Sequence, residues 1–197
     1  DIPLIAGVGS SSTAEAIELV ECSLKNGIKK CLAVTPYYNK PSQKGLELHY
    51  TELSKVGAEI ILYNVPGRTG VDLLPTTIEK LIEIKTIAGI KEAVNTEERF
   101  LALSKIKDKR QDFQLYSGDD PSYVEFMKFK GDGVISVAAN VMPKEIKELS
   151  NLCLAGNFVE AEKTIKNYQE IFKLLFTESS PSPCKFILEK LSLLENN

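Results

Sequence analysis

Residues 86–93 read Thr86-Ile87-Ala88-Gly89-Ile90-Lys91-Glu92-Ala93, an apolar run that ends in two charged residues. The run from Thr86 to Ile90 is too short for a helix and contains three β-branched residues, so it predicts a buried β-strand. Most lysines at the end of a strand point into water. A functional role for Lys91 therefore depends on which residues the rest of the chain brings next to it.

Five other segments have the same form, a strand-like run that ends in polar or glycine-rich residues and precedes a helix-like segment. These runs are residues 3–8, 31–35, 59–63, 113–116 and 133–137. The ends of the first five strands in the chain recur about every 27 residues. A βα repeat of this kind is typical of a parallel sheet, either open and doubly wound or closed into a (β/α)8 barrel.

The barrel is favoured over the open sheet. Ala6-Gly7-Val8-Gly9 lacks the third glycine of a dinucleotide-binding fingerprint and the acidic residue expected after the next strand. Candidate chemistry is instead spread over several strand ends. We predict an α/β fold, a (β/α)8 TIM barrel of which six βα units (three to eight) are present in residues 1–155, followed by an incomplete helical region, residues 156–197.

Local signals place the helices. Ser12 with Glu15 and Asn95 with Glu98 each predict a capping box at the start of a helix. After the sixth strand, three successive helices are expected, at about 143–155, at about 157–176 and, after a Ser/Pro-rich link, up to 191.

Composition excludes several classes of function. The net charge is −3 and charged residues make up 26% of the chain, which gives no reason to expect nucleic acid or a membrane surface as a partner. No apolar run approaches the ~20 residues of a spanning helix, and no leader opens the chain, so a cytoplasmic location is expected. The four cysteines are scattered and His49 is the single histidine. We therefore expect no metal, no cofactor and no disulfide framework, and a half-exposed structural role for His49.

A lysine at a barrel rim can act as a nucleophile. Its amine attacks a ketone to form a Schiff base, provided that the site desolvates the ammonium and lowers its pKa from about 10.4. Tyr63 ends the strand before that of Lys91 and can meet it at the same rim. Tyr38 lies on the loop after the strand before that. Without a suitable histidine, such phenols are the candidates for proton transfer.

Arg68 lies in the loop Pro66-Gly67-Arg68-Thr69-Gly70 and has a guanidinium fork suited to a carboxylate. Each of these residues also has a structural interpretation. Arg68 could form a surface salt bridge, Tyr63 could be a tyrosine at the edge of the core, and Tyr37 with Tyr38 could form an interface pair.

Five stretches of the chain, in order, resemble the dihydrodipicolinate synthase family within the pyruvate-dependent class I aldolases and lyases. They are residues 34–41 (Val-Thr-Pro-Tyr-Tyr-Asn-Lys-Pro), 63–70 (Tyr-Asn-Val-Pro-Gly-Arg-Thr-Gly), 89–93 (Gly-Ile-Lys-Glu-Ala), 117–120 (Ser-Gly-Asp-Asp) and 133–137 (Gly-Val-Ile-Ser-Val). Arg68 in its loop looks like the synthase and argues against the sialic acid lyase branch.

The resemblance implies a lyase that condenses pyruvate with aspartate 4-semialdehyde to 4-hydroxy-tetrahydrodipicolinate, in lysine and diaminopimelate biosynthesis. Lys91 would form the pyruvate imine, Tyr63 would belong to the proton relay, and Tyr38 would complete the relay of a neighbouring subunit. The family is usually a homotetramer, a dimer of dimers.

The resemblance also implies roles for residues around these three. Arg68 would hold the carboxylate of the aldehyde, and the backbone around Ile135 would line the pyruvate pocket. Positions matching Gly9, Ser11, Glu15 and Tyr37 form a lysine effector site in inhibited members. Ser11 replaces their asparagine, which argues against inhibition.

The family's relay threonine belongs to a segment before Asp1, so we expect residues 1–197 alone to form the imine better than they complete the condensation. A related pyruvate or 2-keto acid aldolase, and a non-catalytic remnant that binds pyruvate or partner subunits, are the alternatives.

Overall fold

The computed structural model of the chain describes residues 2–195 and divides into two compact units, Asp1–Tyr116 and Ser117–Asn197. In the first unit, four strands pair in parallel and in chain order: β1 (Ile5–Gly7), β2 (Lys30–Val34), β3 (Glu59–Asn64) and β4 (Ile87–Glu92). The order of hydrogen-bonded strands continues with β5 (Gln114–Ser117) and β6 (Gly133–Val134). The predicted βα repeat with six strands is confirmed.

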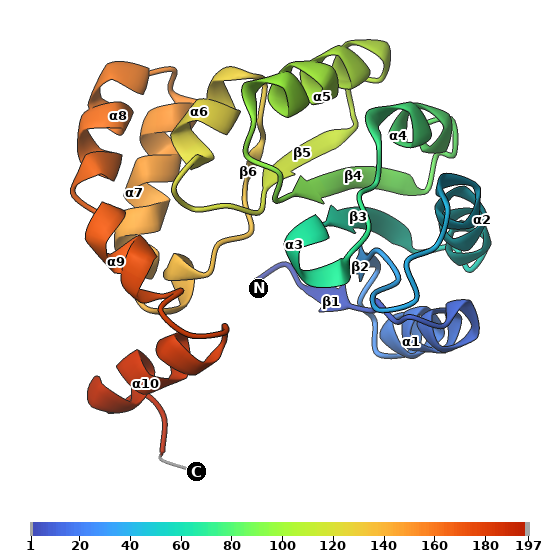
Figure 1. The fold of residues 1–197 in the computed structure, drawn as a ribbon, viewed down its shortest axis with the longest axis horizontal. Coiled ribbons are helices and arrows are strands. Elements are labelled where there is room, and N and C mark those ends of the chain that lie inside the picture. The colour runs from blue at the N-terminus through green and yellow to red at the C-terminus, as the bar shows by residue number, and fades with distance from the viewer. Residues whose placement is uncertain (1, 196–197) are drawn as a thin grey trace. The chain divides into compact units, whose positions relative to one another are not determined.

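Four helices of the first unit cover one side of its strands, as Figure 1 shows: α1 (Thr13–Lys25), α2 (Gln43–Ser54), α4 (Pro75–Leu81) and α5 (Glu97–Lys109). Each packs against the next one in this order. Between helices and strands lies an apolar core that includes Val20, Leu46, Leu53, Ile60, Leu62, Ile78, Ile90 and Leu103. The loop after β3 contains one further helical turn, α3 (Pro66–Thr69).

One of the two predicted capping boxes needs correction. Ser12 caps α1 as expected, because its hydroxyl accepts a hydrogen bond from the backbone N–H of Glu15 at 3.4 Å. The cap of α5 is Thr96 and not Asn95, since the Thr96 hydroxyl accepts from the N–H of Arg99 at 3.3 Å. Asn and Thr are both favoured at this position, so the sequence pattern could not separate the two neighbours.

The second unit is mostly helical. Its elements are α6 (Tyr123–Lys128), the 3-10 turn η1 (Ala138–Asn140), α7 (Pro143–Leu154), α8 (Phe158–Lys166), α9 (Gln169–Leu174) and α10 (Ser182–Lys190). Their shared core includes Tyr123, Leu149, Phe172 and Leu175. The predicted boundary between residues 155 and 156 stays a prediction.

Two predicted elements of this unit differ from the structure. The strand expected at 133–137 ends at Val134, because the backbone N–H groups of Val137 and Ala138 bind the carboxylate of Asp120 at 3.0 and 2.9 Å. The helix expected at 157–176 is interrupted, because the N–H of Tyr168 bonds three residues back, to Ile165, and tightens the chain into a 3-10-type turn. Among residues 2–195, no helix is long and apolar enough to cross a membrane.

Arg110 ties the end of α5 to the turn that leads into β4. Its guanidinium donates to the carbonyl oxygens of Ile82, Ile84 and Ile87 at 2.8–3.2 Å through Nη1, and to that of Lys85 at 3.0 Å through Nη2. One side chain thus satisfies four backbone acceptors at the amino-terminal end of the strand that carries Lys91.

We expect Arg110→Met to lower the free energy of unfolding by about 2 kcal/mol, because hydrogen bonds to a charged group are lost from part-buried carbonyls. Urea denaturation measures the loss. The matched control is Lys109→Met, which removes only the exposed ion pair with Glu79 and is expected to cost less than about 0.5 kcal/mol. Equal losses in the two variants would contradict the role given to Arg110.

Candidate active site

Lys91 and Tyr63 are brought together at the carboxyl ends of β4 and β3. The two residues are direct partners in the register of the strands. Lys91 is only 8% exposed, and its Nζ lies 4.2 Å from the centroid of the Tyr63 ring. An ammonium over an aromatic face is attracted by the ring's negative quadrupole. The carboxyl end of the strands is also where barrel enzymes place their reactive groups.

Tyr63 is half-buried, and its surroundings keep its phenol protonated. Burial raises the pKa of the Tyr63 phenol, while the positive charge of Arg68 acts in the opposite direction and lowers it. The burial effect is the larger one, so the phenol carries its proton at neutral pH. A neutral phenol beside an amine can donate its proton to the oxygen of a leaving group, and the resulting phenolate can accept a proton in a later step.

A pocket of about 460 Å³ opens beside Tyr63. It is lined by Gly7, Gly9, Leu32, Val34, Tyr37, Tyr63, Val65, Arg68 and Thr69. Lys91 is not among these residues, but the ring under its amine is. Gly9 is needed for the shape of this wall, because a Cβ there would lie 2.3 Å from Cγ1 of Val34. The loop after β1 therefore approaches β2 more closely than any other residue type allows.

The Arg68 loop is folded tightly. Arg68 lies in the single turn α3, where its side chain is exposed, and the turn ends at Gly70 with a φ of 75°. The Thr69 hydroxyl lies 3.2 Å from the carbonyl oxygen of Val65 and 3.0 Å from that of Val71, and donates within the same loop. Arg68 and Tyr63 thus face the same pocket from consecutive segments of the chain.

Tyr38 does not line this pocket. It is 92% exposed and adopts a left-handed backbone conformation with a φ of 72°, which is unfavourable for a residue other than glycine. Two hydrogen bonds hold this loop: Tyr38 N–H to Thr69 O at 3.3 Å, and the Asn39 side chain to Ser11 O at 2.9 Å. The loop therefore projects a large aromatic side chain away from its own chain.

The remaining predicted site residues fall in three places. Gly9 and Tyr37 line the pocket beside Tyr63. Glu15 lies in the first turn of α1 and accepts a hydrogen bond from the Ser10 hydroxyl at 2.7 Å, a partner that the sequence did not indicate. Ile135 belongs to the second unit, where its N–H donates to Ser117 O at 2.9 Å.

Sequence reasoning missed a group of four polar residues behind the Lys91–Tyr63 pair. They are Asn64, Asp72, Glu92 and Arg99, of which Asn64 is fully buried and Glu92 is 1% exposed. The available signal was alternation along a strand. Asn64 follows Tyr63 and Glu92 follows Lys91, so both side chains point to the opposite face of the sheet.

His49 is buried, at 4% exposure, and the prediction of a half-exposed histidine was wrong. Its Nδ1 lies 2.9 Å from the hydroxyl of Thr13 in α1, while its Nε2 has no hydrogen-bond partner among the described residues. The helical pattern around His49 could not show that α1 covers this face of α2. Burial lowers the pKa of His49 to about 4.

His49 is expected to make folding sensitive to acid. Its pKa is near 6.5 in the unfolded chain and about 4 in the folded one, so the unfolded chain takes up the proton first as the pH falls between these values. Stability is therefore lost from about pH 6.5 downward, by roughly 2–3 kcal/mol at pH 4. Urea denaturation across this range should show a shallower loss in His49→Gln, and equal slopes would refute this account of His49.

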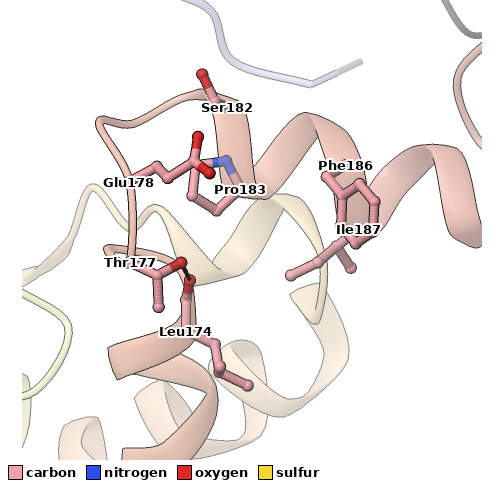
Figure 2. Close-up of a pocket in the computed structure, with 7 residues that line it drawn as sticks. All are labelled: Leu174, Thr177, Glu178, Ser182, Pro183, Phe186 and Ile187. Carbon is pink, nitrogen blue, oxygen red and sulfur yellow. Dashed lines mark hydrogen bonds between the residues drawn. The ribbon is translucent and has the colours of Figure 1, made fainter.

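A second pocket, of about 520 Å³, lies in the second unit between α9 and the start of α10 (Figure 2). Its walls are mostly apolar, with Leu174, Phe186 and Ile187 among them. Its titratable group is Glu178, and it contains no lysine. It therefore does not offer the amine needed for Schiff-base chemistry. Within residues 2–195, no group of three or more His, Cys, Asp or Glu side chains could hold a metal ion.

The first unit therefore has a parallel βα array with a buried lysine at a strand end, a neighbouring tyrosine and an arginine-bearing loop, the layout of a class I aldolase-type barrel. A model of the dihydrodipicolinate synthetase family matches residues 1–197. The chain belongs to this family.

Known members of the family match this chain over its whole length. The 4-hydroxy-tetrahydrodipicolinate synthase of Buchnera aphidicola subsp. Schizaphis graminum is 44% identical over 100% of this chain and 66% of its own length. A crystal structure of dihydrodipicolinate synthase from Thermotoga maritima is 39% identical with a TM-score of 0.96, over 100% of this chain and 68% of that one.

A structure of the Acinetobacter baumannii enzyme, described as chloride inhibited and complexed with pyruvate, is 41% identical with a TM-score of 0.93. It covers 98% of this chain and 66% of that one. The chain thus spans about two thirds of the length of the curated relatives that it matches.

Proposed function

We propose that this chain forms a Schiff base between Lys91 and pyruvate, as part of a 4-hydroxy-tetrahydrodipicolinate synthase that condenses pyruvate with aspartate 4-semialdehyde. The single observation that carries the proposal is the contact between the Lys91 amine and the Tyr63 ring, 4.2 Å apart at a buried strand end. The family and the pyruvate complex of the Acinetobacter relative support it.

In this mechanism the neutral Lys91 amine attacks the ketone carbon of pyruvate, and water leaves to give an iminium ion. Loss of a methyl proton then gives an enamine, whose carbon attacks the aldehyde. Tyr63 supplies the proton for the departing oxygen, which fits a phenol whose pKa is raised by burial. The iminium ion is the electron sink that makes the methyl proton acidic.

Tyr38 has its role on a neighbouring subunit. Its phenol is exposed and its backbone is held in an unfavourable conformation, which suits a residue that completes its environment only in an assembly. We therefore propose a homo-oligomer, a tetramer built as a dimer of dimers, in which Tyr38 completes the proton relay of the adjacent subunit.

Arg68 is the proposed clamp for the carboxylate of the aldehyde. Its exposed guanidinium lies on the pocket wall next to Tyr63, so a substrate reaching the Lys91 enamine passes within range of the fork. The backbone around Ile135 is proposed to line the pyruvate site. We place the protein in lysine and diaminopimelate biosynthesis in the cytoplasm.

Lysine is not expected to inhibit this protein strongly. Among the positions proposed for the effector site, Gly9, Ser11, Glu15 and Tyr37, Ser11 stands where inhibited members of the family have asparagine. In addition, the Glu15 carboxylate already accepts a hydrogen bond from Ser10.

Borohydride reduction in the presence of pyruvate should trap one reduced pyruvate imine on Lys91, because a buried amine is expected to react ahead of solvated lysines. Peptide mass spectrometry identifies the modified residue. The adduct should disappear in Lys91→Met and persist in the control Lys85→Met, which changes an exposed lysine. An adduct on another lysine, or none, would overturn the proposal.

Arg68→Ala should lower kcat/KM for aspartate 4-semialdehyde by about 100-fold, since a bidentate carboxylate contact is lost, while trapping of pyruvate on Lys91 persists. Turnover is measured on the chain joined to the remaining segments of a curated relative. Arg68→Lys keeps the positive charge but loses the guanidinium fork, so its kcat/KM should lie between those of the wild type and Arg68→Ala. Normal condensation by Arg68→Ala would remove Arg68 from the mechanism.

A further inference from the structure

Asn64 is one of two residues that make several hydrogen bonds within the polar group on the sheet face opposite Lys91 and Tyr63. Its amide nitrogen donates to Asp72 Oδ1 at 2.7 Å and to Glu92 Oε1 at 3.0 Å. Its amide oxygen accepts from the backbone N–H of Leu73 at 2.9 Å. Because Asn64 is fully buried, no water can replace a lost partner, and losing one of these hydrogen bonds would leave a buried polar group unsatisfied and lower the stability of the fold.

Arg99 of α5 is the second of these residues. Its Nη2 donates to Asp72 Oδ2 at 2.5 Å, and its Nη1 donates to Glu92 Oε2 and to the carbonyl oxygen of Leu73, each at 3.0 Å. Asn64, Asp72, Glu92 and Arg99, called here the rear network, thus join two strand ends, one loop and one helix.

The rear network lies directly behind the reactive pair. Tyr63 pairs with Lys91 in the register of β3 and β4, and the next pair along is Asn64 with Glu92. Alternate residues of a strand point to opposite faces, so the first pair faces the pocket side and the second faces α5. Any shift of Asn64 against Glu92 moves the backbone that carries Tyr63 and Lys91.

The same network anchors the far end of the Arg68 loop. The loop leaves β3 after Asn64, and its last residues before α4 include Asp72 and Leu73, both of which are bound to Asn64 and Arg99. The three proposed site residues at positions 63, 68 and 91 therefore lie on strands or on a loop whose backbone the rear network holds in place.

Stability alone is a poor reason for such a group. One buried guanidinium is shared by two carboxylates, that of buried Glu92 and that of part-exposed Asp72. Replacing buried ion networks by apolar residues is often neutral or stabilising. Within the described residues, the Glu92 carboxylate accepts hydrogen bonds from three donors: Asn64, Arg99 and the N–H of Val94, the last at 2.8 Å. The arrangement seen here is thus that of the ionised carboxylate.

We propose that Asn64, Asp72, Glu92 and Arg99 are positioning residues for the Schiff-base chemistry, which hold Lys91 against Tyr63 and set the Arg68 loop through the backbone that they share. This inference rests on the proposed function, since it concerns the rate at which Lys91 reacts. The charged groups that face Glu92 are Arg99 from α5 and Asp72 from the Arg68 loop.

The network also predicts a pH dependence. Burial raises the pKa of Glu92 to about 7, although Arg99 lowers it. The carboxylate therefore gains its charge, and its full set of donors, as the pH rises through about 7. The rate of imine formation on Lys91 should contain a step there, in addition to the rise caused by deprotonation of the amine.

The experiment compares wild type with Glu92→Gln, which keeps the shape but not the charge. The rate of adduct formation on Lys91 is measured by borohydride quenching at varied pyruvate concentration, from pH 5.5 to 9. We expect the rate at saturating pyruvate to fall at least about tenfold at pH 8, because the reacting groups are displaced. The half-saturating pyruvate concentration should change less than threefold, and the step near pH 7 should vanish.

Two further variants make the result specific. Asp72→Asn changes a part-exposed member of the network and should lower the rate in the same direction, so it carries the test where Glu92→Gln does not fold. Arg110→Met lowers stability at the other end of β4 and should leave both the rate and its pH profile unchanged.

The outcomes separate the two proposals. No adduct in wild type overturns the proposed function itself. An adduct in wild type together with variant rates within twofold of it, and an unchanged pH profile, overturns the positioning role alone. A loss of rate in Arg110→Met equal to that in Glu92→Gln would also overturn it, because the effect would then follow stability.

Discussion

The register of β3 on β4 is the constraint on which the rest of the site depends. Two consecutive residue pairs, Tyr63 with Lys91 and Asn64 with Glu92, point to opposite faces of the sheet. A slip of one residue would send Lys91 toward the helices and put Glu92 on the pocket side. The buried hydrogen bonds of the second pair make that slip unfavourable, so side chains on one face of the sheet determine the position of the Lys91 amine on the other face.

Features that depend on neighbours in the chain were predictable. The strands that carry Tyr63 and Lys91 are short apolar runs at a regular spacing, and consecutive parallel strands bring their carboxyl ends to one edge. The start of α1 follows from the Ser12 hydroxyl and the amide three residues later. The pairing of Lys91 with Tyr63 is therefore a consequence of the βα repeat.

Features that depend on distant side chains were not predictable in the same way. The bond between Arg99 and Asp72 joins a helix to a loop 27 residues earlier, and in the sequence Arg99 resembles any exposed helical arginine. The burial of His49 depends on α1, and the early end of β6 depends on the Asp120 carboxylate. In each case a polar contact with a residue far away in the sequence decides the local environment, and the pattern of neighbouring residues does not reveal that contact.

The contact between Lys91 and Tyr63 also has an optical consequence. The chain contains seven tyrosines and no tryptophan, so its near-ultraviolet absorption comes chiefly from phenol rings. One of these rings lies under the nitrogen that would carry substrate. If the ammonium there were replaced by the proposed iminium with its neighbouring carboxylate, the added negative charge would change the electric field across that ring. Tyr63 is thus a chromophore placed to register the state of Lys91 without any added label.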